Sequence, residues 1–158
     1  MKQLLLVSWL LLLSAILGLP EVKADVRMPL IFGNHMVLQQ DTRITIWGWA
    51  DAGENIEVLF AGQKVRTTAN ADGTWQVKLK PVKTKKKGET LTITGKNKLV
   101  YSDVLVGDVW VASGQSNMEW GIKVRKEYAD DIAHSEDSLL RLFFVPKNTS
   151  LQPLSEIE

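Results

Sequence analysis

The sequence predicts a mixed fold, in which an all-β sandwich domain is followed by the first β-α-β unit of an α/β domain. Three observations indicate this. Short alternating strands separated by turns fill residues 28–100. A valine-rich run follows, which is typical of a strand buried on both faces of a parallel sheet. A helical pattern and a second apolar run come next. We therefore expect a signal peptide at 1–24, a β-sandwich domain at 25–102 and the incomplete start of an α/β domain at 103–158.

The N-terminus has the pattern of a secretory signal peptide. Lys2 gives a positive start, residues 4–19 are almost wholly apolar, and the small-residue pattern at 22–24 suits cleavage after Ala24. The apolar run is shorter than the roughly 20 residues that span a bilayer, so a membrane anchor is the less favoured alternative. An export signal in a chain without cysteine favours a bacterial periplasmic or extracellular location, with no stable membrane insertion after cleavage.

The composition excludes several classes of function. The 158 residues include 19 Lys and Arg against 18 Asp and Glu, which gives a net charge of +1 instead of the strong positive charge of a nucleic-acid-binding domain. With no cysteine and two histidines, the sequence offers no disulfide scaffold, thiol nucleophile or histidine-rich metal site. We therefore expect no nucleic-acid partner and no metal site built on cysteine or on several histidines.

Alternation of apolar and polar residues predicts the strands of the β domain. Asp72-Gly73 is a hairpin signal, because this pair tolerates positive φ. The lysine-rich run at 83–88 is expected to be a solvated loop and not an anion-binding surface. The expected strands cover residues 36–38, 43–49, 55–60, 64–69, 74–79, 90–94 and 99–101.

Tryptophans in the β domain leave two interpretations open. Trp47 and Trp49 share one face of an expected strand, and Trp75 follows in a later one. Exposed rings could stack on sugars, which would make this a non-catalytic carbohydrate-binding domain. The favoured interpretation is that the rings fill the sandwich core or an inter-domain contact, because large aromatic side chains bury much area. A purely structural role, docking on a catalytic domain, is a further alternative.

The second part has the order of an opening β-α-β unit. A buried strand is expected at 103–112, a helix at 126–135 and a second strand at 139–145, which Pro146 ends. One such unit cannot cover both faces of a parallel sheet. We therefore expect the chain to be the front of a longer one.

Ser116 lies on the turn that follows the first of these strands. Such a position fixes the backbone and projects the hydroxyl into solvent, and the free N–H groups of a following helical turn point toward developing negative charge. Gly114 allows another chain or a substrate to approach closely. Gln115 and Asn117 carry amides that can donate to an oxyanion or brace the turn. The sequence therefore makes Ser116 the candidate nucleophile, with an ordinary turn as the alternative.

The segment around this serine, GDVWVASGQSNMEW at 107–120, resembles the first motif block of the sialate O-acetylesterase family. That family belongs to the SGNH hydrolases, whose catalytic domain is a flavodoxin-like α/β fold. Other segments are similar to the family's N-terminal β domain and second strand, so the resemblance spans nearly all of 28–150. These segments are 36–40, 46–50, 71–75 and 141–146.

The resemblance implies that Ser116 is the nucleophile of an ester hydrolase, with its own N–H as one oxyanion donor. Acetylated sugars would be the substrate, O-acetylated sialic acid first and acetylated xylan-type polysaccharides second, through an acetyl-enzyme. The resemblance implies no metal and no organic cofactor. In the family, the other oxyanion donors and an Asp-x-x-His base come from later motif blocks, which this chain does not contain. We therefore expect this form to be inactive.

Neither histidine is expected to supply the base. Asp131 and His134 match Asp-x-x-His literally, but they follow Ser116 too closely and lie on the expected helix. A surface ion pair between positions i and i+3 explains them. His35 is expected to be a loop histidine.

Overall fold

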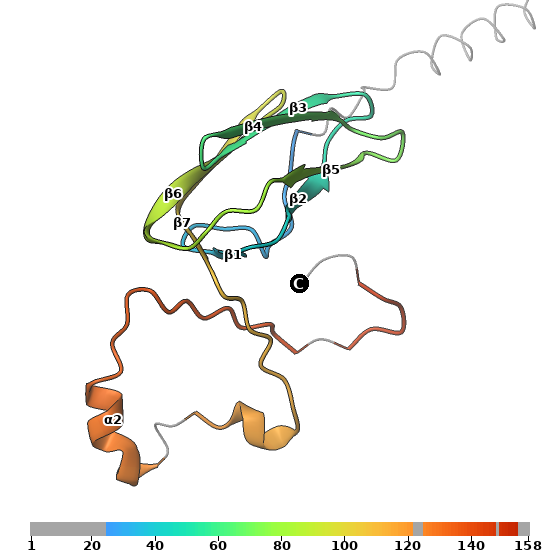
Figure 1. Ribbon diagram of the computed structural model, residues 1–158. Coiled ribbons are helices and arrows are strands. Elements are labelled where there is room, and N and C mark those ends of the chain that lie inside the picture. Colours follow the sequence, from blue (N-terminus) through green and yellow to red (C-terminus); the bar gives the residue numbers. More distant parts are fainter. Residues whose placement is uncertain (1–24, 122–124, 148, 155–158) are drawn as a thin grey trace, which may run out of the picture.

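The computed structural model describes residues 25–121, 125–147 and 149–154, and the expected signal peptide lies outside them. Within the described residues, strands dominate the first part, and short helices occur only after the last strand (Figure 1). The strands are β1 (Val37–Gln39), β2 (Ile44–Trp49), β3 (Asn55–Phe60), β4 (Gln63–Thr68), β5 (Thr74–Leu79), β6 (Lys85–Thr94) and β7 (Lys98–Gly107).

The strands form two sheets. The larger is a mixed sheet in the order β1-β7-β6-β3-β4, in which β1 pairs parallel with β7 and the remaining neighbours are antiparallel. The smaller is the antiparallel pair β2-β5. The register between β6 and β7 shifts twice between Lys85 and Leu91. Such irregularities bend and twist a strand, and β6 and β7 curve visibly in Figure 1.

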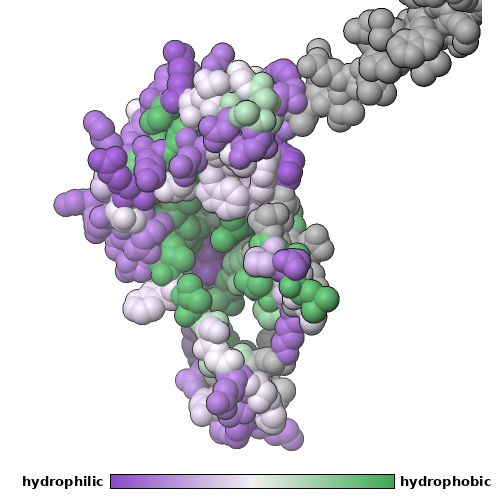
Figure 2. Space-filling view, turned by 90° about the vertical axis from the view of Figure 1, so that its right-hand side faces the viewer, coloured by the Kyte–Doolittle hydropathy of each residue, from purple (hydrophilic) through white to green (hydrophobic). Residues whose placement is uncertain are grey.

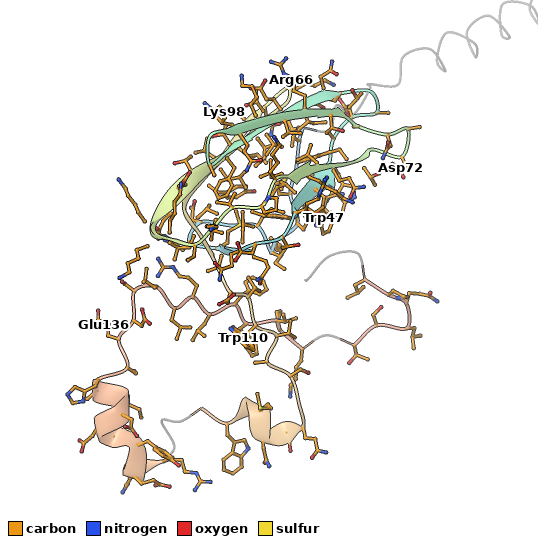
Figure 3. All side chains as sticks on the ribbon, in the orientation of Figure 1. Trp47, Arg66, Asp72, Lys98, Trp110 and Glu136 are labelled. Atoms are coloured by element: carbon orange, nitrogen blue, oxygen red, sulfur yellow. The ribbon has the colours of Figure 1, made fainter. Side chains whose placement is uncertain are left out.

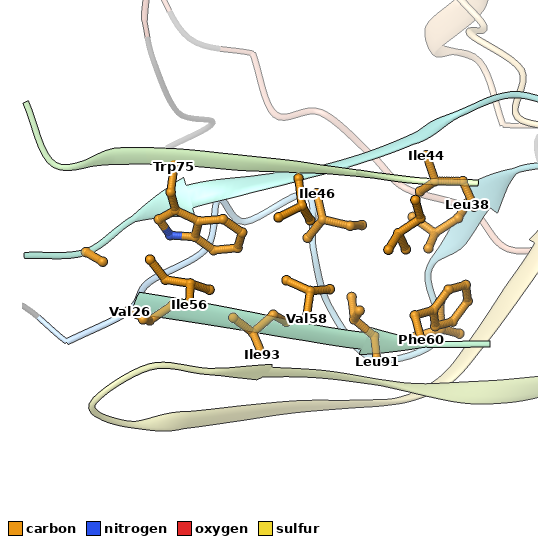
Figure 4. Packing of buried hydrophobic residues seen from close by; sticks show 14 of the residues in the cluster. Val26, Leu38, Ile44, Ile46, Ile56, Val58, Phe60, Trp75, Leu91 and Ile93 are labelled. Atoms are coloured by element: carbon orange, nitrogen blue, oxygen red, sulfur yellow. The ribbon is translucent and has the colours of Figure 1, made fainter. Parts of the chain in front are cut away.

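A common apolar core joins the sheets. Alternate residues of β2 and β5 point toward alternate residues of β3 and β6, so the two sheets face each other across it (Figure 4). Strand β7 contributes Val104 and Val106. The buried members from β2, β5, β3 and β6 are Ile44, Ile46, Trp75, Val77, Leu79, Ile56, Val58, Phe60, Leu91 and Ile93.

The tight turn expected at Asp72-Gly73 is present, but it joins the two sheets and does not form the expected hairpin, because β4 pairs with β3 and β5 pairs with β2. Gly73 has a φ of +79°, a conformation that glycine adopts without strain. The Asp72 carboxylate accepts hydrogen bonds from the Thr74 hydroxyl at 2.7 Å and the Thr74 N–H at 2.9 Å. These bonds favour the ionised carboxylate and hold the pKa of Asp72 below its ordinary value.

Alternation located most of the β strands correctly, but the prediction of a lysine loop at 83–88 was wrong. Strand β6 begins at Lys85 and pairs with Val106 of β7. The lysines at 85–87 remain exposed, as their charge requires, while their backbone takes part in the strand. Gly88 lies so close to β7 that an added Cβ would stand 2.7 Å from the Cα of Asp103. This glycine therefore permits the irregular pairing.

The chain after β7 differs from the expected α/β unit. The strand expected at 103–112 ends at Gly107, so β7 crosses the predicted boundary between residues 102 and 103. Residues 108–112 and 139–145 form no strand, and Trp110 and Val111 are 87% and 92% exposed. A strand needs a neighbour to pair with its backbone, and the described residues offer these two segments none.

The expected helix at 126–135 is present in shorter form. A 3₁₀ turn, η3 (Lys126–Tyr128), leads directly into α2 (Ala129–Ala133). Both lie in the lower part of Figure 1, away from the sheets. No helix among the described residues has the length and apolar character needed to cross a membrane.

The core predicts a clear contrast between two neighbouring positions of β2. Ile46 is completely buried, so Ile46→Ala should lower the free energy of unfolding by about 2–5 kcal/mol in urea denaturation. Thr45 points to the exposed face, and Thr45→Ala should change the free energy of unfolding by no more than about 0.5 kcal/mol. Equal effects of the two substitutions would contradict the observation that Ile46 and not Thr45 points into the core.

Candidate functional site

Ser116 is the first residue of a short 3₁₀ turn, η1 (Ser116–Glu119). The preceding residue, Gln115, is extended, and its carbonyl accepts a hydrogen bond from the Met118 N–H at 2.9 Å. The Trp120 N–H closes the turn on the Asn117 carbonyl at 3.3 Å. Ser116, Gln115 and Asn117 are all exposed. The tight turn expected from the sequence is therefore present, with the serine on its surface.

Gly114 is needed for packing within this turn. A Cβ built on Gly114 would lie 2.6 Å from Cγ of Met118, far inside contact distance. The sequence predicts close approach at this position by another chain or a substrate. In the structure the group that approaches is the Met118 side chain, which folds back over the glycine.

No described side chain forms a hydrogen bond with the Ser116 hydroxyl, and both histidines are engaged elsewhere. His35 Nδ1 lies 2.7 Å from Oδ2 of Asp103. His134 Nδ1 lies 2.7 Å from the carbonyl oxygen of Asp130, one helical turn back. The ion pair expected between Asp131 and His134 is absent from the described contacts, because the His134 ring turns to this carbonyl instead. A serine without a base is a weak nucleophile near neutral pH.

Two glutamines at the end of β1 hold the start of the serine-bearing segment. Gln39 Oε1 accepts a hydrogen bond from the Val109 N–H at 2.8 Å. The Gln40 N–H donates to the Gly107 carbonyl at 2.9 Å, and its side-chain amide donates to Oδ1 of Asp108 at 3.0 Å. Sequence reasoning missed this role. The available signal was a pair of adjacent amides directly after an apolar strand.

The aromatic residues of β2 form a cluster on the outer face of the β2-β5 pair. The Trp47 and Trp49 rings are 5.4 Å apart and inclined at 69°, and Phe32 meets Trp47 at 6.3 Å and 80°. The Arg27 guanidinium lies 4.0 Å from the centre of the Trp49 ring. Each ring therefore has intramolecular partners, an arrangement unlike an open platform for stacking sugars. The expectation of core packing is confirmed for Trp75 and wrong for Trp47 and Trp49, which are half-buried outside the core. For these two rings the expected alternative, an inter-domain contact, stays a prediction.

The described residues contain no group of three or more His, Cys, Asp or Glu side chains arranged to hold a metal ion. The site is thus an exposed serine turn on a segment that the β strands hold at its start. The structure brings Gly114, Gln115, Ser116 and Asn117 together and adds Gln39 and Gln40 as supports.

The role of Gln39 predicts a local change in backbone exchange. Gln39→Ala removes the acceptor of the Val109 N–H, and a hydrogen bond of this kind contributes about 0.5–1.5 kcal/mol. Hydrogen exchange at Val109, followed by NMR, should therefore accelerate about 2- to 10-fold. Gln63→Ala is a matched control, because Gln63 accepts a hydrogen bond from the Lys80 N–H at 2.7 Å in the same way. This substitution should leave the exchange rate of Val109 unchanged. An unchanged Val109 rate in Gln39→Ala would rule out the proposed support.

The known proteins that are similar to this chain include acetylesterases. No protein-family model matches the chain. The sialate O-acetylesterase of Mus musculus is 32% identical over 140 residues, which are 79% of this chain and 26% of that protein. The enzyme of Rattus norvegicus is 34% identical over 141 residues, 79% of this chain and 25% of that protein. The enzyme of Homo sapiens is 29% identical over 140 residues, which are 79% of this chain and 27% of that protein.

A solved structure agrees with these sequences. A carbohydrate acetylesterase from Xanthomonas citri superposes with a TM-score of 0.79 and 36% identity, covering 84% of this chain and 31% of that one. The chain spans about a quarter of the length of the curated relatives that it matches. The resemblance predicted from the sequence is confirmed, and the chain is a homologue of the sialate O-acetylesterases.

Proposed function

We propose that this chain is part of an exported carbohydrate esterase that removes O-acetyl groups from sugars, with Ser116 as its nucleophile. The observation that carries the proposal is the exposed Ser116 turn, on a segment that Gln39 and Gln40 hold at its start, in a chain that matches acetylesterases. In this proposal the β-sandwich domain expected at 25–102 extends to the end of β7 at Gly107. The residues that follow begin an SGNH-type hydrolase domain.

The proposed chemistry is a two-step transfer of an acetyl group. The Ser116 Oγ attacks the acetyl carbonyl carbon and loses its proton to a base, while N–H groups of the turn stabilise the oxyanion. The bond from this carbon to the sugar oxygen breaks, and the sugar leaves as an alcohol after taking a proton. Water then attacks the acetyl-enzyme, releases acetate and restores the serine. In this proposal the base lies outside the described residues, since none of their side chains forms a hydrogen bond with the Ser116 hydroxyl and the two histidines contact Asp103 and Asp130 instead.

Exposed apolar side chains support the proposal that further chain completes the hydrolase domain. Large apolar residues at 109–111 and 142–145 are all more than half exposed. Figure 2 shows apolar surface gathered in the middle of one face, below a mostly hydrophilic upper part. Soluble proteins bury apolar surface of this extent against other chain or a partner. In the proposed domain these two segments become neighbouring strands of the hydrolase sheet.

The substrate and the location are further parts of the proposal. O-acetylated sialic acid is the first candidate, since the curated relatives are named for sialate esters. Acetylated xylan-type polysaccharide is the second, since the similar solved structure is named only as a carbohydrate acetylesterase. The apolar N-terminal segment supports export to the periplasm or the cell exterior.

The role of Ser116 can be tested in a chimera. Residues 25–158 are fused to the remainder of the Xanthomonas citri acetylesterase, and hydrolysis of 4-nitrophenyl acetate is measured. Ser116→Ala should lower kcat at least about a thousandfold, as loss of a nucleophilic serine does. Ser113→Ala, a matched change three residues earlier on the same exposed segment, should leave kcat within about twofold. A folded chimera that hydrolyses the ester equally well with Ser116→Ala would contradict the proposal.

The chain of 158 residues should itself show no hydrolysis above that of its Ser116→Ala variant, because no described group acts as a base for Ser116. Progress curves with 4-nitrophenyl acetate at several pH values would check this. Hydrolysis that is robust in the parent chain and vanishes in Ser116→Ala would show that this chain already contains its base.

A further inference from the structure

One carboxylate joins three distant parts of the chain. Oδ2 of Asp103, in the middle of β7, lies 2.7 Å from Nδ1 of His35 and 2.8 Å from Nη2 of Arg141. His35 precedes β1, and Arg141 follows α2. The first of these contacts joins β7 to the turn before β1, whereas the second reaches the segment that contains Ser116.

The backbone is shaped to make this cluster. Asp103 has a φ of +52° and His35 a φ of +65°, both in the left-handed region that favours glycine. An added Cβ on Gly88 would lie 2.2 Å from Oδ1 of Asp103, so the irregular part of β6 leaves space for the carboxylate. Unfavourable backbone conformations persist where the surroundings fix them, and they concentrate at functional sites.

The loop before β1 is fixed by further hydrogen bonds beside the cluster. Oδ1 of Asn34 accepts from the Ser102 N–H at 2.8 Å and from the Ser102 hydroxyl at 3.2 Å. The His35 N–H donates to the Ser102 carbonyl at 3.0 Å. Residues 34–35 and 102–103 therefore form one rigid unit that presents the Asp103 carboxylate to Arg141.

Arg141 is bound more closely than a surface cation. Its side chain is 26% exposed, and it also donates a hydrogen bond from Nη1 to the Ser138 carbonyl. Hydrogen bonds from His35 first and Arg141 second hold the pKa of Asp103 below its ordinary value. The carboxylate is therefore ionised near neutral pH, when the pair with Arg141 can form.

The pair between Asp103 and Arg141 closes a segment that contains Ser116. The segment leaves the sheet after Gly107, passes through η1 and α2, and returns to β7 at Arg141. Its start is held by Gln39 and Gln40, and its end by Asp103. Without the second attachment the return half would have no described ion pair to the strands.

We propose that Asp103 is a positioning residue, which binds Arg141 while anchored by His35 and thereby fixes the return end of the Ser116-bearing segment to the β strands. We call the ion pair between Asp103 and Arg141 the joint. Its importance for catalysis rests on the proposed function of Ser116. Its existence is independent of that function, and it can be measured in the chain without any substrate.

The test uses two spin labels whose separation reports on the joint. Lys98 lies on the strands and Glu136 on the far segment, and both are exposed (Figure 3). The protein has no cysteine, so Lys98→Cys and Glu136→Cys give unique labelling sites. Pulsed electron paramagnetic resonance should show a narrow distance distribution in the labelled parent. Asp103→Asn and Arg141→Met should each widen it at least twofold.

A conservative variant and a matched control distinguish loss of the joint from a general loss of structure. Arg141→Lys keeps the charge, so its distance distribution should be about as narrow as that of the parent. Glu57→Gln breaks a carboxylate pair of the same type, with Lys64 at 3.0 Å and Arg66 at 2.7 Å, and should leave the width unchanged. Far-ultraviolet circular dichroism checks that the strands remain, and Arg141→Met answers the question if Asp103→Asn does not fold.

The outcomes distinguish the joint from the proposed function. The proposed role of the joint would be wrong if the distance distribution kept its width in both Asp103→Asn and Arg141→Met. It would also be wrong if Glu57→Gln widened the distribution equally. In the active chimera, Asp103→Asn should lower kcat about tenfold with little change in KM, and Arg141→Lys should retain most activity. If the widths respond as expected but the chimera does not depend on Ser116, the joint stands and the proposed function fails.

Discussion

The rest of the structure depends on the apolar layer between the β2-β5 pair and the larger sheet. A two-stranded sheet is at best marginally stable alone, so β2 and β5 persist because Ile46 and Leu79 bury their side chains against β3 and β6. The same layer takes in Val104 and Val106 of β7. Burial of these residues fixes Gly107, the point at which the chain leaves the sheet toward Ser116.

Polar contacts connect the strands of this layer to the segment that contains Ser116. β1 is only three residues long, but its parallel pairing with β7 brings Gln39 beside Gly107 and Val109. Earlier along β7, the left-handed Asp103 turns its carboxylate toward Arg141. The serine turn is thus attached to the strands at both ends of its segment, although neither attachment touches the serine. The strands hold the segment at its ends, and no described side chain forms the hydrogen bond with Ser116 that the proposed chemistry needs.

Much of the fold could be predicted from local pattern. The bounds of β3 and β5 follow from alternation, and the turn at Asp72 follows from the tolerance of Asp-Gly for positive φ. The valine-rich run was only partly predicted: residues 104–106 are buried as expected and residues 105–107 pair parallel with β1, but they belong to the last strand of the β domain and not to the first strand of an α/β domain. Its end was placed too late, because a strand stops where its partner stops, and β1 ends at Gln39.

The remaining features depend on contacts between distant residues. Alternation puts Trp47 and Trp49 on one face of β2 but does not say which face meets the core. The pairing of the lysine-rich start of β6 with Val106 depends on the course of β7. Asp103 and Arg141 are 38 positions apart and no local signal connects them. The serine turn was recognisable because its pattern is local, whereas its supports were not.

The most direct test of the central claim is the reaction of the chimera with a fluorophosphonate probe, followed by peptide mapping with mass spectrometry. The account predicts that the probe modifies Ser116 and leaves Ser113 on the same exposed segment unmodified, because only an activated serine attacks the probe. In the chain of 158 residues neither serine should react. Modification of another residue of the active chimera, with Ser116 untouched, would contradict the account.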